Sequence, residues 1–188
     1  EALVGALRDA GVLQSASDGA TLRSRVRFSS FAGTLVAHSA WPTHDADAVF
    51  FGPDTYRFGA FIERELHQPA AAHRHAGDHG RAHTVVDLGC GSGAGGILAA
   101  RLLQADADAA AHPVRLLFTD VNARALRFAA VNAELAGVPH FECRHSDVLA
   151  NVPEPVDLVL AHPPGLLDPQ ERAYRHGGGE LGTGLALH

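Results

Sequence analysis

The sequence predicts an α/β fold with a Rossmann-like, doubly wound sheet in the second half of the chain, preceded by a small α+β appendage. Three observations support this fold class. Short apolar runs alternate with amphipathic stretches from residue 84 onward, a glycine-rich loop follows the first run, and acidic residues end the later runs. Alternation of strands and helices implies parallel strands joined by right-handed crossovers.

Each element of the domain at residues 84–188 is predicted by its own pattern. Short apolar runs predict buried strands, and stretches with a period of 3.6 residues predict helices. The strands are expected at residues 84–89, 114–120, 140–147 and 156–162, and the helices at residues 93–104 and 122–137.

Residues 1–50 are expected to form a small α+β appendage that recognises the substrate. Apolar spacing predicts a short helix that ends near Gly11. Alternation of apolar and polar residues predicts a strand at residues 21–30, a hairpin partner at 33–41 and a third strand at 47–51.

Residues 51–83 are expected to connect the two parts. Pro53 or Asp54 opens a helix that ends near Gln68. A His-rich stretch without periodicity follows, and it predicts a surface linker.

Composition narrows the range of functions. The net charge of −6 argues against broad nonspecific binding to nucleic acid, although it leaves room for a local basic groove. No apolar run reaches the roughly 18 residues that a membrane helix needs, so we expect no membrane partner. The two cysteines, Cys90 and Cys143, do not suggest a disulfide framework, which favours a cytoplasmic protein.

Five glycines between a strand and a helix form the first candidate binding feature. They stand at positions 89, 91, 93, 95 and 96. Glycines let the backbone turn tightly and approach a ligand, and the helix that follows offers free N–H groups. The spacing of Gly91, Gly93 and Gly96 also fits a dinucleotide loop, so the glycines alone do not decide the ligand.

Acidic residues end the next two predicted strands. Asp120 is placed to accept hydrogen bonds from ribose hydroxyls, although it lies 31 residues after Gly89, where about 20 is usual. Asp147 is placed to bind an adenine amino group. Both can instead be helix N-caps, and for Asp120 both roles can hold together.

The stretch DLVLAHPPGLL, residues 157–167, ends an apolar run with two adjacent prolines. Such a pair makes a stiff, extended turn just past a strand. Such a platform can hold a reacting group in position at near-attack distance.

Together these motifs resemble the class I S-adenosylmethionine-dependent methyltransferases. VVDLGCGSG is similar to the first motif of that family, FTDVN to the second and HSDVL to the third. LAHPPG is similar to the fourth motif of the amino-methylating branch, usually N/D-P-P-Y/F/W. That branch includes release-factor glutamine methyltransferases and small-domain ribosomal RNA guanine methyltransferases. The segments FFGPDTYRFGAFIE and YRHGGGELGTGLAL resemble the flanks of its core.

The resemblance implies S-adenosylmethionine as the cofactor and transfer of its methyl group to a nitrogen. The acceptor is expected in a protein such as a release factor, in an RNA base or in a small molecule. The resemblance places the acceptor site at His162, Pro163 and Pro164. The substrate-side residues that it implies are Tyr56, Phe58 and Gly165. The cofactor-binding residues that it implies are Asp87, Gly89, Cys90, Gly91, Gly93, Asp120, Val121, Asn122, Asp147, Val148 and His162.

The fourth motif departs from the family pattern at two positions. His162 stands where the family has Asn or Asp, and Gly165 stands where it has an aromatic residue that stacks on the substrate. A neutral imidazole has one acceptor nitrogen, so we expect His162 to keep a substrate-facing role. The alternatives are a binding module that has lost catalysis and a nicotinamide-dependent oxidoreductase. A complete fold of this family has seven strands, so we expect the last strands to be missing from this sequence.

Other features have both functional and ordinary explanations. We predict no metal site, because the histidines at 73, 75, 79 and 83 have no cysteine nearby. Arg23, Arg25 and Arg27 form either a phosphate-binding strip or an ordinary solvated sheet face. Trp41 is either a packing residue or a platform for stacking a base. Cys90 fits the loop as a small residue rather than as a nucleophile.

Overall fold

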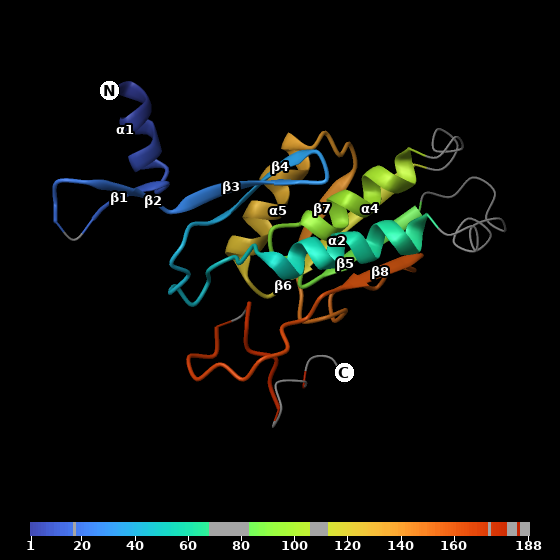
Figure 1. Cartoon of the computed structure of the whole chain (residues 1–188). Coiled ribbons are helices and arrows are strands. Elements are labelled where there is room, and N and C mark those ends of the chain that lie inside the picture. Colours follow the sequence, from blue (N-terminus) through green and yellow to red (C-terminus); the bar gives the residue numbers. More distant parts are fainter. Residues whose placement is uncertain (17, 68–82, 106–112, 173, 180–183, 185–188) are drawn as a thin grey trace.

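A parallel sheet of four strands forms the centre of the computed structural model (Figure 1). The structure describes residues 1–16, 18–67, 83–105, 113–172, 174–179 and 184. The strands are β5 (His83–Leu88), β6 (Val114–Asp120), β7 (Phe141–His145) and β8 (Leu158–Ala161). Their order is β7-β6-β5-β8, and every neighbouring pair is parallel. The α/β fold class and all four predicted core strands are therefore confirmed.

Two helices cross over one face of this sheet. Helix α4 (Ala94–Gln104) packs on β5 and β6, and helix α5 (Ala123–Leu135) packs on β6 and β7. Val85, Leu116 and Phe118 point from the strands into this layer, and each is completely buried. Burial of whole apolar side chains of this size contributes about 2 kcal/mol each to folding.

Local chemistry sets the ends of the helices. The Asn122 side chain accepts a hydrogen bond from the backbone N–H of Arg124 at 2.9 Å and so caps the start of α5. Gly137 lies just past the end of α5 with a φ of +70°, a conformation that a glycine adopts without strain. Helix α2 (Pro53–Leu66) starts with a proline in its first turn and packs against α4. The predicted bounds of α2 are therefore confirmed within two residues.

The predicted N-terminal strands are confirmed only in part. The expected strand at 21–30 is broken at Arg25 into β2 (Leu22–Ser24), which pairs with β1 (Leu13–Ser15), and β3 (Val26–Phe31), which pairs with β4 (Thr34–Ser39). Helix α1 (Ala2–Asp9) and the β1–β2 hairpin project away from the rest of the molecule (Figure 1). The expected His-rich linker lies outside the described residues, apart from His83 at the start of β5.

The predicted strand at residues 47–51 was wrong. This segment makes a local bridge to Ser39 instead of a strand ladder. The Ser39 N–H donates to the carbonyl of Val49 at 3.0 Å, and the Val49 N–H donates to the Ser39 hydroxyl at 2.9 Å. Val49 of this apolar run is buried in the core, and Phe50 is half-exposed. The run therefore contributes to packing without joining a sheet.

Asn132 ties the β3–β4 hairpin to the core of the fold. Its side chain is fully buried on α5. Its Oδ1 accepts from the Ala37 N–H at 2.7 Å, and its Nδ2 donates to the carbonyls of Ala37 and Ser92 at 2.9 and 2.8 Å. One side chain therefore joins β4 to the glycine-rich loop that follows β5.

We predict that Asn132→Ala lowers the free energy of unfolding by about 3 kcal/mol, because it leaves the buried N–H and carbonyl of Ala37 without partners. Urea unfolding followed by circular dichroism measures the loss. Asn151→Ala is the matched control, since Asn151 is exposed and its side chain bonds only locally, to the carbonyl of His145. Equal losses in the two variants would contradict the role given to Asn132.

Candidate functional site

The predicted site residues follow the carboxyl ends of the parallel strands. The glycine loop follows β5, Asp120 ends β6, and His162 follows β8. Because β5 lies between β6 and β8, the glycine loop lies between the other two segments. Ligands of open α/β sheets bind at this edge. The sequence-predicted residues are thus brought to one end of the sheet.

Two glycines of the loop border open space. Gly89 and Gly91 have φ values of +61° and +54°, which disfavour any residue with a side chain. A Cβ added at either position would meet no atom within 4 Å. The loop therefore offers bare backbone to a ligand at these two positions.

The other three glycines are required for packing. A Cβ at Gly93 would come within 2.9 Å of the Phe118 ring, and Gly93 also has a φ of +77°. A Cβ at Gly95 would come within 2.7 Å of the Phe58 ring, and one at Gly96 within 2.9 Å of the Asp87 carboxylate. These three glycines let α4 approach the sheet and α2 closely. The five glycines of the loop thus serve two purposes, since two leave space for a ligand and three allow close packing.

Asp120 faces the glycine loop across the edge of the sheet. Its Oδ2 accepts from the Gly91 N–H at 3.0 Å, and its Oδ1 accepts from the Asn122 N–H at 2.8 Å. Burial raises the pKa of this carboxyl, and the two backbone donors oppose the shift. Asp120 closes the turn before α5, while Asn122 supplies the helix cap, so Asp120 is not itself the side-chain cap. The neighbouring Val121 is half-exposed.

Asp87 is a buried carboxyl beneath the loop. Only 3% of its surface is exposed, and its Oδ2 accepts from the Gly96 N–H at 2.8 Å. Burial raises the pKa of Asp87 from 3.8 to about 7, the Gly96 hydrogen bond acts in the opposite direction, and the charge of Asp120 adds to the increase. Asp87 therefore holds the first turn of α4 and can change its charge near neutral pH.

Cys90 is a buried part of the loop backbone. Its N–H donates to the carbonyl of Thr119 at 3.0 Å, which joins the loop to β6. Burial raises the pKa of its thiol well above the usual value, so the reactive thiolate is suppressed. The structure agrees with a small structural residue at this position.

The predicted third motif forms an exposed turn after β7. Asp147 is exposed, and Val148 has a φ of +47°. The hydroxyl of Ser146 holds the turn by donating to the Val148 carbonyl at 3.0 Å and accepting from the Asn151 N–H at 3.0 Å. The expected alternative role of Asp147 as a helix cap does not arise, because no helix follows it among the described residues.

His162 stacks on an aromatic ring from the N-terminal half of the chain. Its imidazole lies 4.9 Å from the Phe58 ring, centre to centre, with 25° between the planes. His162 and Pro163 are exposed, and Pro164 is half-buried. A Cβ at Gly165 would meet nothing within 4 Å, so the place of the missing aromatic side chain is open space. The imidazole and Phe58 thus form an aromatic wall beside the two prolines.

A model of the methyltransferase small domain matches residues 64–172. The chain belongs to that family. The matched segment contains the glycine loop, the acidic ends of β6 and β7 and the two prolines. Its fold is also that of a solved S-adenosylmethionine-dependent methyltransferase from Agrobacterium tumefaciens, with a TM-score of 0.50 and 14% identity over 85% of this chain and 49% of that one.

Two relatives of this methyltransferase small domain are similar in sequence. A release factor glutamine methyltransferase from Cereibacter sphaeroides is 45% identical over 82 residues, 43% of this chain and 27% of that protein. A ribosomal RNA large subunit methyltransferase G from Streptomyces coelicolor is 43% identical over 95 residues, 48% of this chain and 22% of that protein. The alignments therefore span about a quarter of the length of these relatives.

Tyr56 lies outside the matched segment and has a packing role. Its ring meets those of Phe31 and Phe51 at 5.8 and 5.4 Å, and its hydroxyl donates to the carbonyl of Ser30 at 3.0 Å. It joins α2 to the β3–β4 hairpin. The two predicted substrate-side aromatic residues thus separate, with Phe58 beside His162 and Tyr56 against the hairpin.

Sequence reasoning missed a contact between the segment after the prolines and the N-terminal half. The Tyr174 ring stacks on Phe50 at 5.6 Å and 15°, and its hydroxyl donates to the carbonyl of Thr43 at 3.2 Å. Asp168 is buried, and Arg172 donates to both of its carboxylate oxygens at 2.7 and 2.6 Å. This fork lowers the pKa of Asp168. Only the spacing of Asp168 and Arg172 by four residues was visible in the sequence.

The described residues show neither a metal cluster nor a membrane-spanning helix. No group of three or more His, Cys, Asp or Glu side chains there could hold a metal ion. None of the helices in the described part of the chain has the length and apolar character needed to cross a membrane.

We predict that Asp87 makes the folded chain less stable as the pH rises from about 4 to about 7. In that window the folded chain keeps a proton on Asp87 that the unfolded chain has lost, so the free energy of unfolding falls with increasing pH. Asp87→Asn keeps an acceptor for the Gly96 N–H but removes the titration. The stability of the variant relative to the parent should therefore increase by up to about 4 kcal/mol between pH 4 and pH 7.

Urea unfolding of both proteins at half-unit pH intervals measures this difference. Parallel stability curves for the two proteins across the window would show that Asp87 does not titrate there.

Proposed function

We propose that this chain is the catalytic part of an S-adenosylmethionine-dependent methyltransferase that transfers the methyl group to a nitrogen. The observation that supports this most directly is the meeting of the glycine loop, Asp120 and the His162-Pro163-Pro164 segment at one edge of the sheet, in a chain of the methyltransferase small domain family. Each of the three segments has a separate task in such a reaction.

The residues at the edge of the sheet fit an adenosyl cofactor. Gly89 and Gly91 leave space where side chains would stand, which allows backbone contact with the ligand. Asp120 still has acceptor capacity on both carboxylate oxygens after its two backbone bonds, so it can accept from ribose hydroxyls. Asp147, Val121 and Val148 are exposed on the adjoining loops, where we place the adenine side of the pocket. The cofactor supplies a methyl group made electrophilic by its sulfonium charge.

The residues after β8 position the acceptor nitrogen. His162 accepts a hydrogen bond from an NH2 group, and the carbonyl of Pro163 accepts a second. The bound cofactor would supply the methyl group, and His162 or water would take the proton that the acceptor nitrogen loses. The Phe58 ring holds the imidazole in place, because stacking at 4.9 Å restricts its rotation.

The relatives indicate the kinds of acceptor. One is named for methylation of glutamine in a release factor and one for methylation of ribosomal RNA, and both a glutamine amide and a base amine offer a planar NH2 group. We infer that residues 1–50 contribute to recognition of the acceptor and that residues 84–188 hold the cofactor. The two cysteines are free, which agrees with work in the reducing cytoplasm.

We predict that the chain binds S-adenosylmethionine and S-adenosylhomocysteine and that Asp120→Asn weakens both by about 10- to 100-fold, because one charged acceptor is lost. Isothermal titration calorimetry measures the affinities, with NAD as a third ligand. Asp54→Asn is the control, since Asp54 lies on the surface of α2 and pairs with Arg57. Binding of NAD without binding of either adenosyl ligand would overturn the proposed function.

We predict that His162→Ala reduces methyl transfer about 100-fold and that His162→Asn keeps most of it, because only the amide retains an acceptor for the NH2 group. Transfer of labelled methyl groups into the protein and RNA fractions of a cell extract measures activity. Calorimetry with S-adenosylmethionine confirms that both variants keep the cofactor site. Equal activity of the two variants would exclude a direct role for His162, and cofactor binding without any transfer by the parent chain would favour a binding module.

A further inference from the structure

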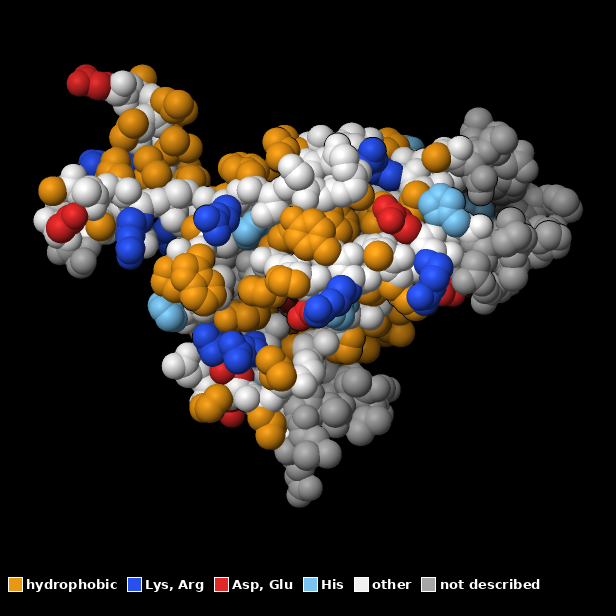
Figure 2. All heavy atoms as spheres, viewed as in Figure 1, with side chains coloured by type: hydrophobic (Ala, Val, Ile, Leu, Met, Phe, Trp, Pro, Cys, Tyr) orange, Lys and Arg blue, Asp and Glu red, His pale blue; other side chains and the backbone are white. Residues whose placement is uncertain are grey.

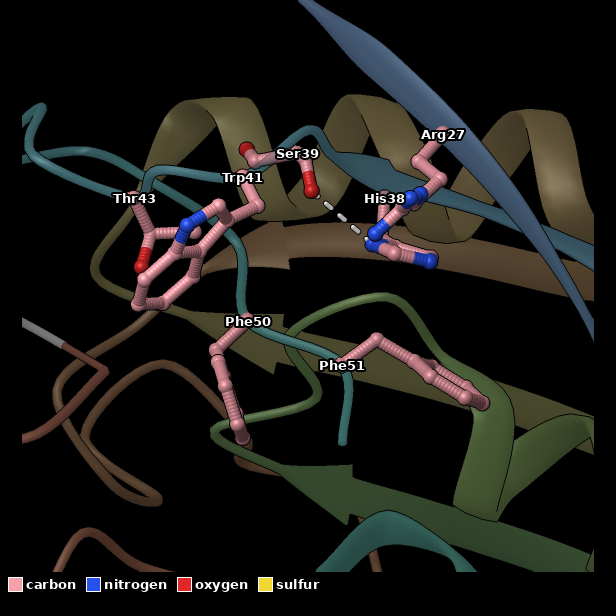
Figure 3. Close-up of a pocket in the computed structure, with 7 residues that line it drawn as sticks. All are labelled: Arg27, His38, Ser39, Trp41, Thr43, Phe50 and Phe51. Atoms are coloured by element: carbon pink, nitrogen blue, oxygen red, sulfur yellow. Dashed lines mark hydrogen bonds between the residues drawn. The ribbon is translucent and has the colours of Figure 1, made fainter. Parts of the chain in front are cut away.

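A pocket of about 140 Å³ lies between the β3–β4 hairpin and the segment that follows it. Figure 3 shows the seven residues that line it, which are Arg27, His38, Ser39, Trp41, Thr43, Phe50 and Phe51. None of the residues assigned above to the cofactor or to the acceptor nitrogen is among them. A cavity of about this size, roughly 150 Å³, holds a benzene ring in an engineered protein.

The aromatic residues of the pocket differ in how they are held. Phe50 is stacked on Tyr174, and Phe51 is stacked on His38 at 5.0 Å and 17°. Trp41 is 75% exposed, and no ring of the described residues stacks on it. Two rings are therefore fixed as walls, and the indole remains free to stack on a planar ligand.

The charges around the pocket favour an anion. Arg27 is exposed at the rim, and within the described residues it has no carboxylate partner. No acidic side chain lines the pocket. The nearby Asp45 pairs with Arg25 and Arg124 at 3.3 and 3.1 Å, and Asp47 also pairs with Arg124 at 3.1 Å. The local carboxylates are thus already neutralised, and Arg27 remains available for a phosphate.

The arginines do not form one continuous basic surface on the face shown in Figure 2, where they are spread among hydrophobic groups. Together with the net charge of −6, this argues against holding nucleic acid by a broad electrostatic field. A local contact that combines one cation with aromatic planes is the arrangement by which proteins hold single-stranded bases.

His38 is a fixed wall of the pocket rather than a reactive group. Its Nδ1 donates to the carbonyl of Ser39 at 2.9 Å, and its Nε2 meets the Ser29 hydroxyl at 2.9 Å. Burial lowers the pKa of His38, so its ring remains neutral at physiological pH. Both ring nitrogens have partners, which leaves Arg27 as the charged group of the pocket.

Three contacts join the pocket to the candidate site. Asn122, which follows Asp120, donates from its side chain to the carbonyl of Asp47 at 2.9 Å. Tyr174, from the segment after the two prolines, stacks on Phe50 and bonds to Thr43. The loop that carries Phe50 thus contacts both the turn after β6 and the segment after β8.

We propose that this pocket binds a nucleotide of single-stranded RNA that neighbours the methylated one, with its base stacked on Trp41 beside Phe50 and its phosphate paired with Arg27. The inference rests on the proposed function and names the acceptor class for it. A protein acceptor would present an amide or an aliphatic side chain, for which a free indole and an unpaired guanidinium offer less specific contacts.

The test uses the fluorescence of Trp41, which is the single tryptophan of the sequence. The full chain is titrated without cofactor with a single-stranded hexaribonucleotide, with guanosine 5′-monophosphate and with guanosine. We expect quenching by all three and an affinity for the monophosphate several-fold higher than that for the nucleoside.

Two matched variants separate the phosphate contact from general charge. Arg27→Gln should weaken binding of the hexaribonucleotide about 5- to 10-fold and lower the salt slope by about one unit. Arg23→Gln removes an equal charge from the exposed strand β2, outside the pocket, and should change the affinity less than about twofold. Trp41→Ala, followed by filter binding, should weaken binding at least about fivefold.

Absence of quenching, or equal effects of Arg27→Gln and Arg23→Gln, would overturn the proposal. Tighter binding of a glutamine-containing peptide than of the hexaribonucleotide would also overturn it, in favour of a protein acceptor. Calorimetry with S-adenosylmethionine is independent of these titrations. Binding of RNA without binding of S-adenosylmethionine would support the pocket proposal and contradict the methyltransferase proposal. Binding of S-adenosylmethionine without binding of RNA would contradict the pocket proposal alone.

Discussion

The side chain of Asn132 is the contact on which the arrangement of both halves depends. It bonds to the N–H and carbonyl of Ala37 in the N-terminal hairpin and to the carbonyl of Ser92 in the glycine loop. Hairpin, helix and loop pack closely here, so these backbone groups are buried away from water. The Asn132 amide supplies the hydrogen bonds that they would otherwise lack. Because the N–H of Cys90 in this loop also donates to the carbonyl of Thr119 on β6, the hairpin and the edge of the sheet form one hydrogen-bonded unit.

Close packing sets the shape of the glycine loop. Gly95 and Gly96 bring the first turn of α4 against Phe58 and Asp87, and a side chain at either position would displace these neighbours. The Phe58 ring in turn stacks on His162. A chain of direct contacts therefore runs from the loop through α2 to the segment after β8, so substitutions in α2 affect both ends of the candidate site.

Much of the fold could be predicted from the sequence because its elements have strong local signals. Strands β5, β6 and β8 contain apolar runs, and Asn122, Pro53 and Gly137 mark helix ends by their own chemistry. The failures lie where long-range contacts decide. The run at 47–51 looks like a strand, but its bonds go to the end of β4, and the strand expected at 21–30 breaks at Arg25.

For the candidate site too, the positions of the motifs could be predicted from the sequence, whereas the long-range contacts could not. The motifs placed the glycine loop, Asp120 and His162 at the strand ends, since those positions follow from the parallel topology. The division of the glycines into open and packed positions, the stacking of Phe58 on His162 and the bonds of Asn132 were not predictable. The stacking of Phe58 on His162 and the bonds of Asn132 join residues at least 40 positions apart, for which the sequence contains no local signal. The division of the glycines depends on where Phe58, Phe118 and Asp87 lie in the folded chain.

The contact of Tyr174 with Thr43 and Phe50 has a geometric consequence. The segment that follows the two prolines is held by contacts within itself, since Arg172 donates to Asp168 and Leu166 pairs with His176. Because this segment also contacts the N-terminal half at both of its ends, it fixes the separation between His162 and the pocket beside Trp41. A substrate that occupies both places must span that separation, so the chain would select its target by spacing as well as by the chemistry of the acceptor.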